Sequence, residues 1–205
     1  MDGTLRALLV ACAAVLATTA TAAETQAAAT TGQNEYRAPY TKLGKTDAVH
    51  EGAKEPKRVL YVFFDANCYY CHLAWKALQP YEKVGLQVRW VPVAYQKPTS
   101  LGRAAAIMQA GDRAAALRDN ESGYDAARFD GGIAPLQEVP PKLSAQIQVN
   151  TALMQAFGAP GTPALVWKDR SGIRVRAGVP RLSELPGMTG LPAQPNADPE
   201  LAKFR

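Results

Sequence analysis

Two cysteines, Cys68 and Cys71, are separated by two residues in the stretch "NCYYCHLAW", Asn67–Trp75. This spacing fits two chemistries. Cys-x-x-Cys-His is the attachment signature of a c-type haem, with His72 as an axial iron ligand, whereas Cys-x-x-Cys opening a helix after an apolar strand is typical of thiol–disulfide exchange. A purely structural disulfide is a third interpretation, but closing so short a loop removes little chain entropy.

The elements around the cysteine pair favour sulfur exchange. "KRVLYVFFD", Lys57–Asp65, is a β-branched and aromatic run without polar alternation, which predicts a strand buried on both faces. The following "CYYCHLAWKALQPYEKV" places Cys71, Trp75 and Leu78 at helical spacing, and Asn67 can cap this helix. The first cysteine would then lie at the positive end of a helix dipole, which stabilises a thiolate.

Each residue of the motif has an expected role in such exchange. We expect Cys68 to attack a disulfide and Cys71 to resolve the mixed disulfide that results. Tyr69 and Tyr70, between the cysteines, would help to set thiol reactivity and contact substrate. His72 could modulate the thiols if it carries charge, or it could simply lie on the helix surface.

The haem and zinc alternatives have less support from the sequence. A porphyrin tethered to both cysteines would collide with the sheet, and a zinc site would need His72 and His50 at an unusual spacing. Nothing singles out a sixth iron ligand among the methionines Met108, Met154 and Met188. We therefore expect no cofactor and no metal.

The rest of the chain predicts an α/β fold. A second strand, Leu86–Ala94, follows the helix and completes a β-α-β unit. The Ala-rich region of about 100–157, with breaks at Gly131-Gly132 and Pro140-Pro141, is too long for a loop and predicts an inserted helical subdomain. The C-terminal part predicts a hairpin and a short helix: strands Pro163–Asp169 and Ile173–Val179, and a helix near Arg181–Leu185.

The N-terminus has the pattern of an export signal. Residues 1–23 combine a basic Arg6, a short apolar core and an Ala-x-Ala arrangement, with cleavage after Ala22 or Ala23. A lipoprotein box ending at Cys12 is the alternative. Residues 24–55 predict an N-terminal arm or linker, 56–190 the catalytic domain, and 191–205 a Pro-rich, extended tail.

The charge distribution argues against nucleic-acid binding. The 205 residues carry a formal net charge of +5. The basic residues are scattered, with no Lys/Arg run longer than two. A surface that follows a phosphate backbone usually needs clustered cations, so we expect no nucleic-acid partner.

Two segments together resemble a known family. "VLYVFFDANCYYCHLAW" and, some ninety residues later, "FGAPGTPALVWKDRSG" resemble the thioredoxin-fold domain of periplasmic disulfide isomerases of the DsbC/DsbG type. The resemblance implies a thioredoxin-like fold in which Thr162-Pro163 has a cis peptide bond and lies opposite the cysteines. It also implies that Thr162 and the backbone beside Pro163 receive the substrate chain by strand-like hydrogen bonds next to Cys68.

The resemblance also implies partners: cysteine-containing exported protein substrates in the periplasm and a membrane thiol–disulfide electron donor. Two departures qualify it. The roughly thirty residues before the domain are too polar for the family's dimerisation domain, which puts dimerisation in doubt, and Val62 stands where many thioredoxins have a buried acid. Three functions therefore stay open: a reductase or isomerase, a disulfide-donating oxidase, and a non-catalytic peptide-binding chaperone.

Overall fold

The computed structural model describes residues 35–205. The predicted signal sequence, the lipoprotein alternative at Cys12 and the first part of the predicted arm, residues 24–34, lie outside the described residues. Within the described part, no helix is long and apolar enough to cross a membrane.

A five-stranded mixed sheet forms the centre of the fold, in the order β1-β3-β2-β4-β5. The strands are β1 (Val49–Gly52), β2 (Arg58–Asp65), β3 (Leu86–Val93), β4 (Ala164–Asp169) and β5 (Gly172–Ala177). β2 pairs in parallel with β3 on one side and antiparallel with β4 on the other. The helices are α2 (Arg37–Leu43), α3 (Tyr69–Glu82), α4 (Ser100–Gln109), α5 (Arg113–Ser122), α6 (Pro141–Ala156), α7 (Leu185–Thr189) and the 3-10 helix η1 (Pro199–Phe204).

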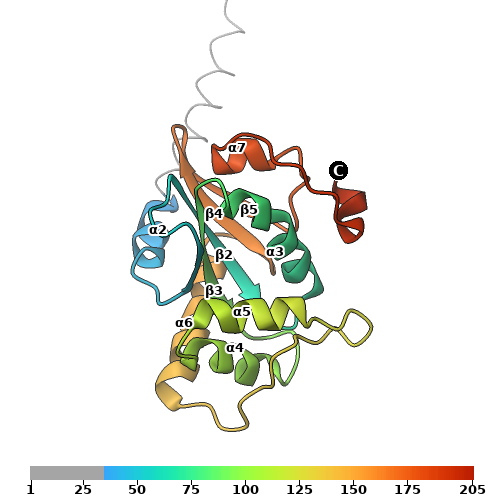
Figure 1. Cartoon of the computed structure of the whole chain (residues 1–205). Coiled ribbons are helices and arrows are strands. Elements are labelled where there is room, and N and C mark those ends of the chain that lie inside the picture. Colours follow the sequence, from blue (N-terminus) through green and yellow to red (C-terminus); the bar gives the residue numbers. More distant parts are fainter. Residues whose placement is uncertain (1–34) are drawn as a thin grey trace, which may run out of the picture. The chain divides into compact units, whose positions relative to one another are not determined.

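Both faces of β2 are buried, as its unbroken apolar run predicts. Side chains alternate between two hydrophobic clusters, with Leu60, Val62 and Phe64 on one face and Tyr61 and Phe63 on the other. Helix α3 packs on the first face, and α2 and α6 pack on the second, so the sheet lies between helical layers (Figure 1). The predicted α/β fold and its β-α-β unit, β2-α3-β3, are confirmed.

The helical insertion between β3 and β4 is also present. It consists of α4, α5 and α6, which agrees with the prediction for about 100–157. Residues 123–140, however, form an irregular connection with one short bridge between Asp125 and Asp130. This segment contains both predicted breaks, Gly131-Gly132 and Pro140-Pro141, but it is longer than the breaks alone, because its glycines and prolines interrupt helix propagation.

Both ends of the predicted domain differ from the structure. The predicted arm includes α2 and β1, and β1 extends the sheet by pairing antiparallel with β3. The predicted extended tail contains η1, whose Leu201 is fully buried against the first cluster. The four residues of β1, "VHEG", are too few and too polar to predict a strand, although β3 supplies a complete partner for them.

Candidate active site

Both cysteines lie at the N-terminus of α3, where β2 delivers the chain to the edge of the sheet. Cys68 is the residue that precedes the first turn, and its carbonyl oxygen accepts hydrogen bonds from the backbone N–H groups of Cys71 and His72. Both cysteines are free thiols and are buried, Cys68 with 4% and Cys71 with 1% of its surface exposed. The structure therefore places Cys68 just before the first turn of α3 and Cys71 within that turn, close to the arrangement that the spacing predicts.

The two thiols differ in acidity. The pKa of the Cys68 thiol is lowered to about 7, chiefly by a hydrogen bond from Cys71 and to a smaller extent by the Thr162 side chain, against the opposing effect of burial. Burial raises the pKa of Cys71 well above its ordinary value, and the neighbouring Cys68 raises it further. A thiolate therefore forms more readily at Cys68 than at Cys71.

Thr162 and Pro163 lie against the cysteine pair from a distant part of the chain. Their peptide bond is cis, which confirms that part of the prediction. The Cys68 thiol donates to the Thr162 carbonyl oxygen at 3.5 Å. Since β4 begins at Ala164 and pairs with β2, the sheet itself fixes this approach.

Tyr95, in the segment after β3, makes two hydrogen bonds with Thr162. The Thr162 backbone N–H donates to the Tyr95 hydroxyl at 2.8 Å, and that hydroxyl donates to the Thr162 Oγ1 at 3.1 Å. The Tyr95 side chain is 45% exposed. Burial is the largest cause of its raised pKa, and the nearby cysteines add to it, so the phenol stays protonated near neutral pH.

Asp65 is the last residue of β2, and the hydrogen bonds of its side chain go to neighbouring loops and to α4, not to the sulfurs. Its carboxylate is fully buried and accepts four hydrogen bonds. These come from the backbone N–H groups of Asn67, Tyr95 and Gln96 and from the Ser100 hydroxyl. A buried carboxylate needs such donors, and here they join the strand to the start of α4.

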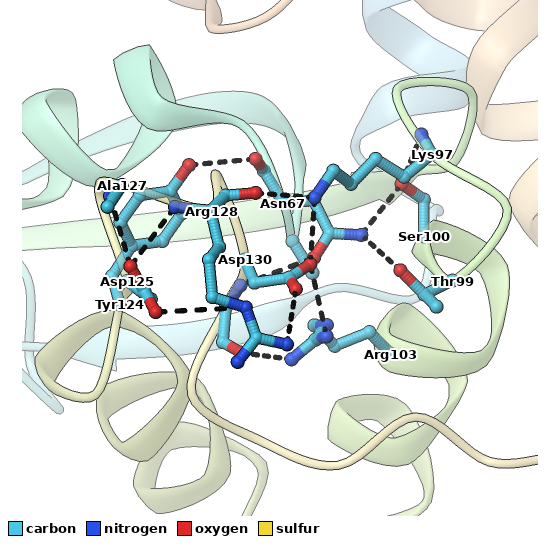
Figure 2. Close-up of polar contacts among 12 residues, drawn as sticks. Asn67, Lys97, Thr99, Ser100, Arg103, Tyr124, Asp125, Ala127, Arg128 and Asp130 are labelled. Atoms are coloured by element: carbon cyan, nitrogen blue, oxygen red, sulfur yellow. Dashed lines mark hydrogen bonds and ion pairs between the residues drawn. The ribbon is translucent and has the colours of Figure 1, made fainter.

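Asn67 joins the cysteine motif to two loops (Figure 2). Its side chain donates to Thr99 and Ser100 and accepts from the Gly131 N–H, while its backbone carbonyl accepts from the Tyr124 hydroxyl. No side-chain cap closes the start of α3, so the prediction that Asn67 caps this helix was wrong. The Asn67 side-chain amide instead makes hydrogen bonds to residues that are distant in the sequence, which the local spacing does not reveal.

Lys97 and Arg103 hold residues 125–131 against this network (Figure 2). Lys97 donates to the Arg128 carbonyl at 2.6 Å and pairs with Asp130 at 3.1 Å. Arg103 donates to the carbonyls of Gly131 and Ile133. The first part of the connection between α5 and α6, residues 124–133, is thereby tied to the residue that precedes Cys68.

Aromatic side chains border the cysteines. Tyr69 contacts the rings of Tyr70, Tyr124 and Phe129 at centroid distances of 5.8, 6.1 and 6.1 Å. Tyr70 and Phe129 are 51% and 54% exposed, and Phe129 adopts a positive φ of 52°. The Lys203 ammonium from η1 lies 5.6 Å from the centre of the Tyr70 ring. An apolar, partly exposed rim therefore adjoins the motif.

His72 is buried, so the alternative that it simply lies on the helix surface was wrong. Its Nδ1 lies 3.4 Å from Glu121 and its Nε2 lies 3.5 Å from Glu200. The ring stacks on Tyr124 at 4.8 Å and lies 6.3 Å from Trp75. The imidazole therefore connects α3 to α5 and η1, and its predicted influence on the thiols stays a prediction.

Two site residues, Tyr95 and Tyr124, were absent from the sequence prediction. Tyr95 follows β3, and the carboxyl ends of parallel neighbours β2 and β3 meet at one edge of the sheet, so its proximity to Cys68 was predictable in principle. Tyr124 lies in the irregular connection and had no such signal. Among residues 35–205, no group of three or more His, Cys, Asp or Glu side chains is placed to hold a metal ion.

The sheet order and the position of the cysteine pair agree with a comparison against known protein families. The chain belongs to the family of thioredoxin-like domains, whose model matches residues 46–185. Two crystal structures share this fold. Proteus mirabilis ScsC in a transitional conformation matches with a TM-score of 0.55 and 20% identity, and the match covers 82% of this chain and 84% of that one. The thiol-disulfide exchange protein alpha-DsbA2 of Wolbachia pipientis matches with a TM-score of 0.55 and 15% identity, and the match covers 78% of this chain and 95% of that one.

Sequence comparison gives more specific relatives. The chain is 28% identical over 153 residues to the thiol:disulfide interchange protein DsbG of Pseudomonas aeruginosa, covering 74% of this chain and 58% of that protein. It is 30% identical over 124 residues to the thiol:disulfide interchange protein DsbC of Haemophilus influenzae, covering 60% and 49%. The chain thus spans about half the length of the curated relatives that it matches, and the DsbC/DsbG resemblance is confirmed.

Proposed function

We propose that the protein is a thiol–disulfide oxidoreductase that reduces or isomerises disulfides in polypeptide substrates. One observation carries the proposal: Cys68, whose pKa is lowered to about 7, contacts Thr162 and shares a helical turn with the buried, less acidic Cys71. An acidic outer thiol next to a buried partner is the arrangement that mixed-disulfide chemistry requires.

The exchange proceeds in two displacements. The Cys68 thiolate attacks one sulfur of a substrate disulfide, the substrate S–S bond breaks, and the leaving sulfur departs as a thiolate. Cys71 then loses its proton and attacks Cys68, which releases the second substrate sulfur and leaves a Cys68–Cys71 disulfide. Two electrons pass from the protein to the substrate, and an external dithiol donor must return them. In isomerisation, a substrate thiol displaces Cys68 instead.

The binding of the substrate chain would use Thr162. Its backbone lies beside Cys68 at the start of β4, where an extended chain could pair with it in the manner of strand addition. Tyr69 and Tyr70 would contact side chains on either side of the disulfide. The export pattern of residues 1–23 and the similarity to DsbC and DsbG support cysteine-containing periplasmic proteins as substrates and a membrane thiol–disulfide electron donor.

A second candidate function is a disulfide-donating oxidase, in which electrons pass from the substrate to the protein. A hydrogen bond that stabilises the Cys68 thiolate stabilises the reduced form of the cysteine pair, and this favours donation of the disulfide. Equilibration with glutathione measures the reduction potential and separates the two directions. Reactivation of a scrambled, multi-disulfide protein tests isomerisation directly. We expect activity in the wild type and none in Cys68→Ser. Undiminished activity in Cys68→Ser would contradict the mechanism.

A further inference from the structure

The Tyr95 hydroxyl accepts a hydrogen bond from the Thr162 backbone N–H, a group that a substrate chain would need. It accepts from the Thr162 backbone N–H at 2.8 Å and donates to the Thr162 Oγ1 at 3.1 Å. The Thr162 carbonyl is meanwhile 3.5 Å from the Cys68 sulfur, which donates to it. Both main-chain polar groups of Thr162 are therefore already engaged within the protein.

An extended polypeptide pairs with a single residue through that residue's N–H and C=O groups. The carbonyl becomes free when the Cys68 thiol loses its proton, because a thiolate has no hydrogen to donate. The N–H does not become free in this way, because its partner is a tyrosine hydroxyl whose pKa is raised. A substrate chain must therefore displace the phenol before it can form both bonds.

We propose that Tyr95 is a substrate-displaced latch: its hydroxyl covers the Thr162 N–H in the free protein and yields that group to the carbonyl of an extended polypeptide during binding. This role rests on the proposed function. It makes Tyr95 a specificity-determining residue, since a small disulfide without a peptide main chain can reach Cys68 without using the Thr162 N–H.

The surroundings of Tyr95 suit this motion. Its side chain is 45% exposed, so the displaced hydroxyl can be hydrated, and the exchange costs little in unmade hydrogen bonds. Cys68 is only 4% exposed, so some rearrangement must accompany the approach of a substrate. A Cβ at Gly161 would lie 3.3 Å from the Tyr95 oxygen, and the absence of a side chain there leaves the phenol room to reach Thr162.

Tyr95→Phe tests the latch, because it removes the hydroxyl and keeps the ring. The reduced protein is mixed with a disulfide-bonded linear peptide or with bis(2-hydroxyethyl) disulfide, and acid quenching followed by alkylation gives the second-order rate constants. We expect the ratio of the peptide rate to the small-disulfide rate to rise about threefold to tenfold, as the loss of one net hydrogen bond would give. Tyr36→Phe is the matched control, because Tyr36 packs against the second cluster, which contains neither cysteine, and it should leave the ratio unchanged.

Hydrogen exchange at the Thr162 amide gives a second, structural measurement. The amide should be protected in the wild type, exposed in Tyr95→Phe, and protected again when the peptide is trapped on Cys68 in a Cys71→Ser background. An unchanged rate ratio, or equal acceleration with both disulfides, would overturn the latch alone. Failure of the wild type to exchange with either disulfide would overturn the proposed function, and the latch with it.

Discussion

At the scale of single residues, Cys68, the proposed nucleophile, owes its acidity chiefly to its partner thiol. Cys68 is buried, and burial alone would raise its pKa, but the hydrogen bond from Cys71 outweighs this effect and lowers the pKa to about 7. Thr162 adds a smaller contribution of the same sign. In the proposed mechanism, the second cysteine would therefore activate the first before it resolves the mixed disulfide.

This dependence gives a matched pair of variants. Cys71→Ala removes the hydrogen-bond donor, so the pKa of Cys68 should rise towards its ordinary value of 9.0. Cys71→Ser keeps a donor at the same position and should hold the pKa closer to 7. The pH dependence of iodoacetamide alkylation, or of thiolate absorbance, measures both values. Equal midpoints in the two variants would assign the acidity of Cys68 to the helix terminus instead.

The sequence identified residues whose chemistry is local and missed those whose contacts are distant. Cys68 and Cys71 were predictable because two thiols at helical spacing have few alternative uses. Tyr95 was missed because nothing near it in the sequence marks its hydroxyl as the partner of Thr162, 67 positions away. Asn67 was misassigned as a helix cap because a local hydrogen bond is the default for such a residue, whereas three long-range bonds are present here.

At the scale of elements, the connection between α5 and α6 is coupled to the start of α3 through Asn67. We expect Asn67→Ala to lower the free energy of unfolding by about 1–3 kcal/mol, because its loss leaves buried partners without bonds. Urea unfolding of Asn67→Ala, Thr99→Ala and the double variant measures this loss and the coupling between the two side chains. Strictly additive losses would contradict a direct contribution from their hydrogen bond.

The 3-10 helix η1 fixes the C-terminus to α3. Leu201 is fully buried, Lys76 pairs with Asp198 and Glu200, and the Asn196 side chain donates to the Lys76 carbonyl. Helix α3 carries the cysteines on its first turn and His72 beside them. The C-terminal segment therefore supports the helix on which the proposed chemistry depends.

Truncation of Leu201 tests this support. Leu201→Ala should lower the free energy of unfolding by about 2–5 kcal/mol, because it leaves a cavity against α3. Val149→Ala is the control, since Val149 is 60% exposed and its change should stay within about 0.5 kcal/mol. Thermal or urea unfolding gives both values. A loss at Leu201 no larger than at Val149 would show that η1 contributes nothing to stability.

Elements with a strong pattern were predicted and those with a weak pattern were not. The apolar run in β2 predicts a buried strand without any information about its neighbours. The observed bounds, Arg58–Asp65, differ from the predicted ones by one residue. β1 and η1 are short, and each forms because a larger element supplies its partner: β3 for β1 and α3 for η1. Such elements depend on tertiary contacts, which propensity and periodicity do not contain.

At the scale of the whole molecule, the buried carboxyl group of Glu51 connects β1 to α3, β3 and α5. Glu51 of β1 is 4% exposed and accepts from the indole N–H groups of Trp75 in α3 and Trp90 in β3. Arg118 of α5 lies 3.7 Å from its second oxygen. Burial raises its pKa to about 7, and burial together with Glu51 raises that of Glu82 to about 8.

These raised values predict how stability changes with pH. A carboxyl group whose pKa is higher in the folded than in the unfolded state binds its proton more tightly when folded, so its contribution is full below the ordinary pKa of 4.5. That contribution is lost as the pH rises through 4.5 to about 7 for Glu51, and to about 8 for Glu82. Stability should therefore fall between about pH 5 and pH 8.5.

Glu51→Gln isolates this effect, because the amide keeps an oxygen for the tryptophans and cannot ionise. Between pH 5 and pH 8.5, the free energy of unfolding of the variant should rise relative to the wild type by about 2–3 kcal/mol, as a pKa difference of this size implies. Urea unfolding across this range measures it, with the exposed Glu55→Gln as control. Parallel wild-type and Glu51→Gln curves would show that Glu51 ionises as easily in the folded protein as in the unfolded chain. In that case Arg118 and the two indoles would have to compensate fully for its burial.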